Sequence, residues 1–305
     1  GRMIPPAGID QLREFDAILL GAVGHPDVPD HTTLNGLLLP IRRAFDQYAC
    51  VRPAKLYPGG STPLSDPGRI DLVIVRENTE GEYSQAGGFL YRHTPEEVAL
   101  QTAVFTRRGV ERIVRYAFDL ARRRERKKVT SITKSNAQGY SMVLWDHTFA
   151  EVAREYPDVE TESLLVDAAA VHFVRRPHTF DVVVGSNLFG DILSDLAAAI
   201  TGSLGLAPSA NLNPSREFPS MFEPVHGSAP DIAGKGIVNP IAMILSAAMM
   251  LDHLQLSRAA TAIDAAVKDL LATDGPRTPD LGGTGSTDQV GSEIVGRIAS
   301  AGAPA

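Results

Sequence analysis

Short apolar runs alternate with amphipathic stretches along most of the chain. The apolar runs have the length of strands, and several stretches between them repeat apolar residues at the three- and four-residue spacing of a helix. Strands that alternate with helices favour a parallel or mixed sheet with helices on its faces. The predicted strands are Asp16–Leu20, Asp71–Val75, Lys128–Ile132, Ser163–Val166 and Phe180–Val184.

Two helices stand out in the same pattern. The first is predicted over Arg108–Arg124, where the apolar residues fall on one stripe. Asn239 and Pro240 have the character of an N-cap followed by proline in the first turn, and they open a nearly all-apolar helix that ends near Leu254. A helix that is apolar on every side is expected inside a domain or at a subunit contact.

Two segments interrupt this alternation. Residues Glu82 to Thr106 have few helix signals and several β-formers, which predicts a projecting hairpin. The Ala/Gly/Pro-rich tail Ala299–Ala305 is expected to fray.

The composition narrows the class of protein. The 305 residues are 44% hydrophobic and 21% charged, enough for one large domain or two of ordinary size. A net charge of −7 argues against a nucleic-acid partner. The single cysteine, Cys50, excludes an intrachain disulfide and fits a core position in a cytoplasmic protein. The longest apolar run, Ile241–Leu251, is too short to span a bilayer.

Two acids follow a predicted strand in Gly185–Asp195. If a helix begins near Asp191, then Asp191 and Asp195 lie on one face, one turn apart, where like charges repel. A hard cation such as Mg²⁺ or Mn²⁺, held by carboxylates and substrate oxygens, would relieve that repulsion. The alternative is one acid favoured by the helix dipole and a second acid in solvent.

Other charged residues come directly after predicted strands. Arg76 and Glu77 follow one strand, Lys134 a second and Asp167 a third. In open α/β sheets, ligands bind outside the carboxyl ends of the strands, so we expect the site there.

Three arginines, Arg42, Arg52 and Arg76, are candidates for binding a carboxylate substrate. The guanidinium group matches a carboxylate with two parallel hydrogen bonds. Three such groups near several acids suggest a di- or tricarboxylate, although each arginine alone could be a surface salt-bridge partner.

Lys134 and Tyr83 are candidate proton carriers. Their ordinary pKa values lie near 10, so catalysis at neutral pH requires a metal or cationic neighbours. The alternatives are a core tyrosine with a satisfied hydroxyl and a lysine paired with Asp167.

The run Glu223–Pro240 contains small residues that let the backbone approach a flat or phosphorylated ligand. It has neither the G-x-G-x-x-G fingerprint nor a P-loop, so it could bind a nucleotide or simply be a tight turn. The residues alone therefore predict a metal-assisted enzyme acting on a small carboxylate, with a lyase or hydrolase still open.

Two of these runs, Asn187–Asp195 and Glu223–Pro240, together resemble the metal-dependent β-decarboxylating dehydrogenase family, which includes isopropylmalate, isocitrate, tartrate and D-malate dehydrogenases. The resemblance extends from about Asp16 to the end of the chain. The segments most similar to the tartrate/D-malate branch are Val75–Ser84, Thr133–Asn136 and Pro208–Pro214.

The resemblance implies an α/β fold of the isocitrate/isopropylmalate dehydrogenase type, a two-domain α/β/α arrangement with a mixed sheet. Residues 1–47 and 202–305 would form a large domain on the cofactor side. Residues 48–201 would form a second domain with the substrate and metal residues, an arm and dimer contacts. Family members carry a strand and a Gly-rich turn before the position of Gly1, roughly 60 to 70 residues by ordinary element sizes. Their absence from this sequence predicts that the 305-residue chain could lack activity.

The resemblance also implies residue roles. Arg42, Arg52 and Arg76 would bind the substrate carboxylates. Tyr83 would protonate the enol, and Lys134 of a partner chain would assist removal of the hydroxyl proton. Mg²⁺ or Mn²⁺ would be held by Asp191, Asp195 and Asp167, with Asp167 contributed by a second subunit of an obligatory homodimer.

The cofactor implied is NAD. A carboxylate at Asp231 would accept from the ribose 2′-hydroxyl and repel a 2′-phosphate. The residues expected at the cofactor are Asn136, Glu223, His226, Gly227, Ser228, Ala229, Asp231 and Asn239.

The leading prediction is NAD-dependent oxidative decarboxylation of D-malate, tartrate or both. Isopropylmalate dehydrogenase is the rival of the same class, since Leu38 and Leu39 could line a pocket for an isopropyl group. The segment Asn35–Ile41, however, has neither the serine expected for isocitrate nor the acid expected for isopropylmalate. A non-catalytic regulatory subunit is the rival of a different class, and the full set of acids, tyrosine and lysine argues against it.

Overall fold

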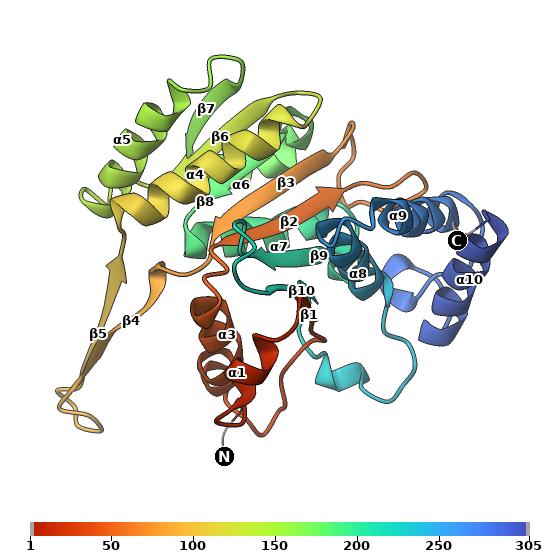
Figure 1. Ribbon diagram of the computed structural model, residues 1–305, viewed down its shortest axis with the longest axis horizontal. Helices are drawn as coiled ribbons and strands as arrows, with labels where there is room; N and C mark the ends of the chain where they lie inside the picture. The colour runs from red at the N-terminus through yellow and green to blue at the C-terminus, as the bar shows by residue number, and fades with distance from the viewer. Residues whose placement is uncertain (1–2, 303–305) are drawn as a thin grey trace.

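One mixed sheet of eight strands forms the centre of the protein. A computed structural model describes residues 3–302, so the last three residues of the predicted frayed tail lie outside the described part. The strand order is β1-β10-β9-β2-β3-β8-β6-β7 (Figure 1). The strands β3, β8, β6 and β7 run parallel to one another, whereas β2 and β9 run antiparallel to their neighbours. This is the mixed sheet that the strand and helix pattern predicts.

The strands are close to those expected from the apolar runs. The main sheet contains β1 (Ala17–Leu19), β2 (Ala49–Lys55), β3 (Asp71–Glu77), β6 (Lys128–Thr133), β7 (Glu160–Leu165), β8 (Val182–Gly185), β9 (Pro208–Leu212) and β10 (Ser220–Pro224).

Helices fill both faces of the sheet. The α-helices are α1 (Gly8–Leu12), α2 (Asp30–Thr33), α3 (Leu39–Ala44), α4 (Arg107–Arg122), α5 (Ser141–Ala153), α6 (Val166–Arg175), α7 (Asn187–Ile200), α8 (Ile241–His253), α9 (Ser257–Ala272) and α10 (Thr287–Ser300). Helices α4 and α5 cover one face of the β3–β8–β6 region and α6 and α7 cover the other, while α8 packs on β9 and β10 (Figure 1). Among residues 3–302, no helix is both long and apolar enough to cross a membrane.

Buried side chains gather in one large core and two smaller ones. The large core draws its fully buried residues from positions 49–200, between the sheet and α4 to α7. One smaller core joins α8, α9 and α10 and includes Tyr57, and the other joins β1 to α3. The sheet runs unbroken through these regions, because β2 pairs with β9. The division at residues 47 and 201 therefore stays a prediction.

The expected hairpin is confirmed. Strands β4 (Gly81–Leu90) and β5 (Val98–Val104) form a separate two-stranded antiparallel sheet, and this arm projects away from the body (Figure 1). Every residue of β5 is exposed. The arm therefore adds little to the core of a single chain.

Several boundaries differ from the predictions, and two of these differences affect charged residues of the candidate site. Strand β7 ends at Leu165, and Val166 already belongs to α6, so Asp167 lies in the first turn of a helix and not directly after a strand. Arg76 and Glu77 are the last residues of β3 and do not follow it. The apolar character of Val166 suits a strand and a buried helix start equally, so the pattern could not separate them.

Candidate functional site

Helix α7 positions the two acids of the central motif. It begins at Asn187, four residues before the predicted start at Asp191, because the Ser186 side chain accepts a hydrogen bond from Phe189 N and forms the N-cap. Asp191 and Asp195 therefore lie one turn apart in the helix body, on one face. The expected spacing holds although the expected helix start was wrong.

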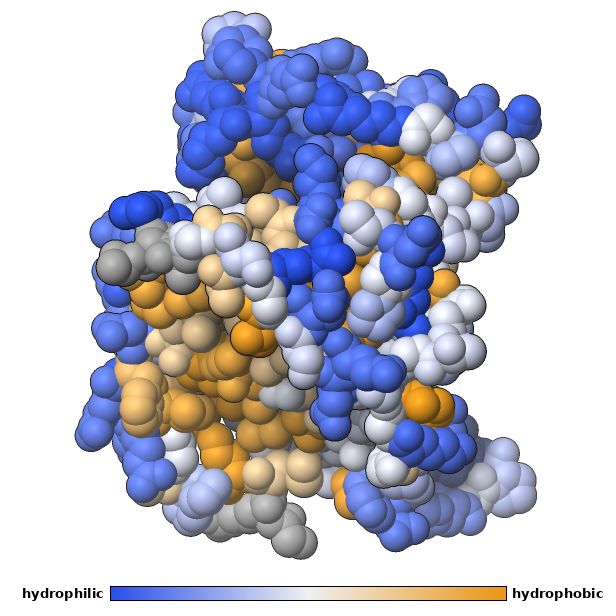
Figure 2. Space-filling model, turned by 90° about the vertical axis from the view of Figure 1, so that its right-hand side faces the viewer, coloured by the Kyte–Doolittle hydropathy of each residue, from blue (hydrophilic) through white to orange (hydrophobic). Residues whose placement is uncertain are grey.

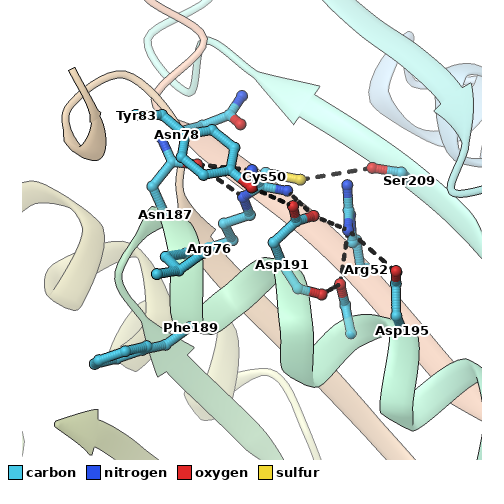
Figure 3. A network of polar contacts seen from close by, with 12 residues as sticks. Cys50, Arg52, Arg76, Asn78, Tyr83, Asn187, Phe189, Asp191, Asp195 and Ser209 are labelled. Atoms are coloured by element: carbon cyan, nitrogen blue, oxygen red, sulfur yellow. Dashed lines mark hydrogen bonds and ion pairs between the residues drawn. The ribbon is translucent and has the colours of Figure 1, made fainter. Parts of the chain in front are cut away.

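Three side chains from distant parts of the chain converge on Asp191 (Figure 3). Arg52 Nη1 lies 2.9 Å from Asp191 Oδ1, and Arg76 Nη1 donates to the same oxygen. Tyr83 donates its hydroxyl proton to Asp191 Oδ2 at 2.7 Å. Arg52 comes from β2, Arg76 from β3 and Tyr83 from the base of the arm, so three strands meet at one turn of α7.

This arrangement sets the protonation of the groups. Burial would raise the pKa of Asp191, but the guanidinium groups of Arg76 and Arg52 hold it below its ordinary value. Burial and the hydrogen bond to Asp191 raise the pKa of Tyr83 to about 12. At neutral pH, Asp191 is therefore an anion and Tyr83 a neutral proton donor.

Asp195 gives the site an open side. Its side chain is 59% exposed, and its nearest cation, Arg52 Nη1, is 3.9 Å away. Burial, together with the nearby charge of Asp191, raises its pKa. Both oxygens of Asp191 already accept hydrogen bonds, so a cation at Asp191 would compete with those donors. At the exposed Asp195 a cation would meet no such competition.

The donor chemistry fits Mg²⁺ or Mn²⁺, because both prefer carboxylate oxygens. Among residues 3–302, however, no three His, Cys, Asp or Glu side chains lie close enough together to hold a metal. Two acids of one chain would thus need a third ligand from elsewhere.

The third predicted acid lies apart from this pair. Asp167, in the first turn of α6, forms a 2.6 Å ion pair with Lys134, which follows β6. The hydrogen bond from Lys134 lowers the pKa of Asp167. The Asp167 side chain is 65% exposed, so within one chain it contacts neither Asp191 nor Asp195 but faces solvent.

The third arginine holds a different acid. Arg42, on α3, is buried and donates to Glu223 Oε1 at 2.8 Å, and Asn211 donates to the same oxygen. The Nε atoms of Arg42 and Arg52 are buried and have no acceptor among the described residues. The structure therefore places Glu223 with the arginines.

A largely apolar pocket of about 420 Å³ lies at the loop after β10. His226, Gly227, Ala229 and Asn239, four of the residues expected at the cofactor, line it. Leu204, Ile232, Ile237 and Val238 supply apolar walls. Figure 2, which views the side carrying α9 and α10, shows hydrophobic side chains in a hollowed area below a hydrophilic upper part.

The remaining cofactor candidates are not among the residues that line this pocket. Asn136 is exposed in the turn after β6, and Asp231 is exposed in a short 3-10 turn, Pro230–Ile232. Ser228 neighbours Gly24, whose added Cβ would lie 2.8 Å from the Ser228 hydroxyl. Helix α8 begins one residue later than predicted, so its N-cap is Pro240 and not Asn239. Asn239 Oδ1 accepts from Ile241 N at 3.0 Å.

Several residues that contact the candidate site were not predicted from the sequence. Arg76 donates to Asn187 Oδ1 through Nε and Nη2, and Arg52 donates to the Ser194 hydroxyl at 2.6 Å. Both partners stand inside the Asn187–Asp195 motif, so an amide and a hydroxyl beside the acids were available signals. Asp280, which accepts from Asn239 at the pocket, had no such signal because 41 residues separate the two.

Comparison with known proteins gives consistent matches. A family model described as isocitrate/isopropylmalate dehydrogenase matches residues 1–294. A probable tartrate dehydrogenase/decarboxylase of Agrobacterium vitis is 56% identical over 301 residues, which cover 98% of this chain and 84% of the relative. The D-malate dehydrogenase [decarboxylating] of Escherichia coli is 54% identical over 302 residues, covering 96% and 83%.

A solved structure supports the same fold. The isocitrate dehydrogenase of Methylococcus capsulatus superposes with a TM-score of 0.88 at 42% identity, covering 97% of this chain and 85% of that one. These matches agree with the site geometry, in which α7 carries two acids and Arg52 and Arg76 bind the first of them. The chain belongs to the isocitrate/isopropylmalate dehydrogenase family and is an oxidoreductase of the decarboxylating dehydrogenase type.

Proposed function

We propose that the protein is a cytoplasmic, NAD-dependent enzyme that oxidatively decarboxylates D-malate, tartrate or both. The convergence of Arg52, Arg76 and Tyr83 on Asp191 carries the proposal, because it joins carboxylate-binding groups, a proton donor and an acid in one place. Relatives named tartrate dehydrogenase/decarboxylase and D-malate dehydrogenase, at more than half identity, support the choice of substrate.

The arginines would bind the two carboxylates of the substrate. Arg52 and Arg76 are buried and bind a carboxylate within the protein, that of Asp191, which supports a role in binding such an anion. Within residues 3–302, the buried Nε donors of Arg42 and Arg52 have no acceptor. Charge-assisted bonds of this kind fix orientation as well as supplying affinity.

Asp191 and Asp195, with Asp167 of a second subunit, would hold Mg²⁺ or Mn²⁺. Such a cation, when bound, lowers the pKa of a substrate hydroxyl and stabilises negative charge on oxygen. NAD, which would occupy the pocket beside His226 and Asn239, supplies the hydride acceptor.

The chain's own groups would move the protons. Lys134 of a second subunit would assist removal of the hydroxyl proton of the substrate. Tyr83, held neutral by its raised pKa, would donate its proton to the enolate carbon left after CO₂ departs. From D-malate the products are pyruvate, CO₂ and NADH.

A homodimer with shared sites would complete the set of acids. Apolar side chains on the outer face of α6 and α7, Val171, Val174 and Ile192, are about half exposed. Asp167 and Asp195 lie on the same two helices, so a second copy packed there would cover apolar surface and bring acids of two chains together. Phe89, Leu90 and Leu100 of the arm offer further apolar contact area.

The same-class rival, isopropylmalate dehydrogenase, receives less support. Leu39 is buried at 3% exposure, and Leu38 packs on the core formed by Ile41 and Phe45. Leu39 thus belongs to the protein interior, and Leu38 is partly buried against the same core, which leaves both poorly placed to line a pocket for an isopropyl group.

The test is NADH formation by the purified protein with D-malate, tartrate, isopropylmalate and isocitrate, each with Mn²⁺ or with chelator. We expect turnover of D-malate or tartrate that the chelator abolishes. Asp191→Asn should lower kcat by about a thousandfold or more in a protein that still folds, because it removes an anion from the site. Its unfolding temperature should also fall, since Arg52 and Arg76 lose the carboxylate that they bind. Asp288→Asn, on the exposed side of α10, is the matched control and should keep full activity.

Other outcomes would change the assignment. Faster turnover of isopropylmalate or isocitrate would replace the substrate, and a preference for NADP would replace the cofactor. No turnover of any of the four acids by the folded protein would overturn the enzymatic proposal.

A further inference from the structure

The base of the arm is fastened to the start of α7 by one carboxylate. Glu82 Oε1 accepts from the Ser186 hydroxyl at 2.7 Å, and Glu82 Oε2 accepts from Leu188 N at 3.1 Å. Leu188 is the second residue of α7, so its N–H has no partner within the helix. Glu82 thus completes a cap that Ser186 begins, although 106 residues separate it from Leu188.

A second contact fixes the same junction. Asn187 donates from Nδ2 to Glu80 O at 3.0 Å, while its Oδ1 accepts from Arg76. Between these ties, Gly81 has a φ of +79°, and an added Cβ would lie 3.4 Å from Asn187 Cβ. The backbone of residues 80–82 therefore lies directly against the first turn of α7.

Tyr83 follows immediately and contacts the next turn of the same helix. Its hydroxyl donates to Asp191 Oδ2 at 2.7 Å (Figure 3), and its carbonyl accepts from Arg43 Nη2 at 3.0 Å. The distance between the Tyr83 hydroxyl and Asp191 thus depends on where the base of the arm sits along α7. Glu82, next to Tyr83, is the arm side chain that bonds to Ser186 and to the first turn of α7.

We propose that Glu82 is a positioning residue for Tyr83: by binding the first turn of α7, it holds the Tyr83 hydroxyl at the height of Asp191. The inference rests on the proposed function, in which Tyr83 protonates the enolate. A small misplacement of a proton donor lowers the rate strongly while leaving substrate affinity nearly unchanged.

The chain offers a matched control two residues away. Glu80 accepts from Thr106 N and from the Thr106 hydroxyl, each at 2.8 Å, and so supports the start of α4. Its side chain does not bond to α7; only its backbone carbonyl does, and that carbonyl remains after substitution. Glu80 and Glu82 therefore each accept hydrogen bonds at the start of a helix, Glu80 at α4 and Glu82 at α7.

The experiment compares Glu82→Leu, Glu82→Gln and Glu80→Leu under the conditions in which the wild-type protein is active. Glu82→Leu should lower kcat on the order of tenfold with KM changed by less than about twofold. Glu82→Gln keeps one oxygen for Ser186 and should recover part of the loss. Glu80→Leu should keep kcat, whatever its effect on stability.

A double-mutant cycle with Tyr83→Phe separates positioning from a general structural effect. If Glu82 acts through Tyr83, Glu82→Leu lowers kcat in the wild-type background and adds nothing to Tyr83→Phe. The same fold-loss in both backgrounds overturns the proposal, and so does an unchanged kcat for Glu82→Leu alone.

Amide hydrogen exchange gives a readout that does not depend on turnover. Glu82→Leu should speed exchange at the Leu188 amide, because that amide loses its acceptor, and Glu80→Leu should not. If the wild-type protein turns over none of the acids, the proposed function fails by itself. Even then, unchanged exchange at Leu188 in Glu82→Leu would refute the hydrogen bond between Glu82 and α7, independently of the proposed function.

Discussion

At the residue scale, Glu77 is a titratable group outside the proposed reaction. Its carboxylate is 2% exposed at the end of β3 and accepts from Thr79 N, Glu80 N and the Thr79 hydroxyl. Arg112 Nη2 lies 3.9 Å from it and donates to Thr79 instead. Burial outweighs these hydrogen bonds and raises the pKa of Glu77 to about 7.

This pKa predicts a pH-dependent stability. Between about pH 4.5 and 7 the folded protein keeps a proton on Glu77 that the unfolded chain releases, so the free energy of unfolding falls as the pH rises through that window. Glu77→Gln removes the titration. Urea unfolding at pH 5 and pH 8 should show a fall in the wild type that is larger by on the order of 1 to 3 kcal/mol than in the variant.

Glu96→Gln, an exposed substitution on the arm, is the control and should keep the wild-type difference between the two pH values. An equal pH dependence in Glu77→Gln and the wild type would contradict the raised pKa.

The charged and hydroxyl residues of the candidate site could be predicted from the sequence, but the residues that they contact could not. Asp191, Arg52, Arg76 and Tyr83 were predicted as site residues, and the structure brings these four together. The bond between Glu82 and Ser186 joins residues 104 apart, and no periodicity encodes such a pairing. The roles of these residues in binding and catalysis remain proposals.

At the element scale, α7 packs unusually close to β3. An added Cβ at Gly190 would lie 2.6 Å from Arg76 Cβ and 3.1 Å from Arg76 Cα. Only glycine lets the helix approach the strand so closely, and this approach places Asp191 within reach of the Arg76 guanidinium.

Gly190→Ala should therefore destabilise the protein by about 1 to 3 kcal/mol, since the backbone of β3 cannot move away cheaply. Gly291→Ala on α10 is the control, because nothing lies within 4 Å of its added Cβ. In an open helical position this change should stabilise by roughly 0.5 to 1 kcal/mol. Equal unfolding midpoints for the two variants would show that the contact is not tight.

Elements were predicted better than their ends. The periodic stripe of α4 and the alternation of strands and helices gave the right element types. The start of α7 was missed because the four residues after its N-cap, Ser186, could equally belong to a turn before the helix. The π-helical turn Leu34–Leu38 between α2 and α3 was not predicted, since it has no pattern distinct from an α-helix.

At the scale of the whole molecule, the three aspartates proposed to hold a metal lie in two separate parts of the chain. Asp191 and Asp195 lie on α7, while Asp167 is paired with Lys134 beyond their reach in the same chain. A dimer with exchanged residues would make each complete site depend on both copies. Such dependence predicts complementation between inactive subunits.

Asp167→Asn and Asp191→Asn should each be inactive alone. After the subunits are mixed and exchanged, half of the dimers should be mixed, and each mixed dimer should have one intact site. Turnover should therefore recover to about a quarter of the wild-type value. Tyr83→Phe with Asp191→Asn should recover nothing, because both changes affect the same chain's share of the site. Failure of the first pair to recover, with exchange verified by native mass spectrometry, would refute shared sites.

The global arrangement was beyond the sequence argument except through family likeness. The α/β class followed from alternation, but the order of eight strands depends on long-range pairing such as β2 with β9. Local residue patterns carry no information about that pairing, and the similarity to solved structures supplies it.

The buried position of Cys50 has a practical consequence. Cys50 is the sole cysteine of the chain, it is fully buried on β2, and its Sγ lies 3.5 Å from the Ser209 hydroxyl. The folded protein thus presents no native thiol to a maleimide dye. A cysteine engineered at the tip of the arm would carry the label alone, so energy transfer between labelled copies could follow how two arms approach each other in real time.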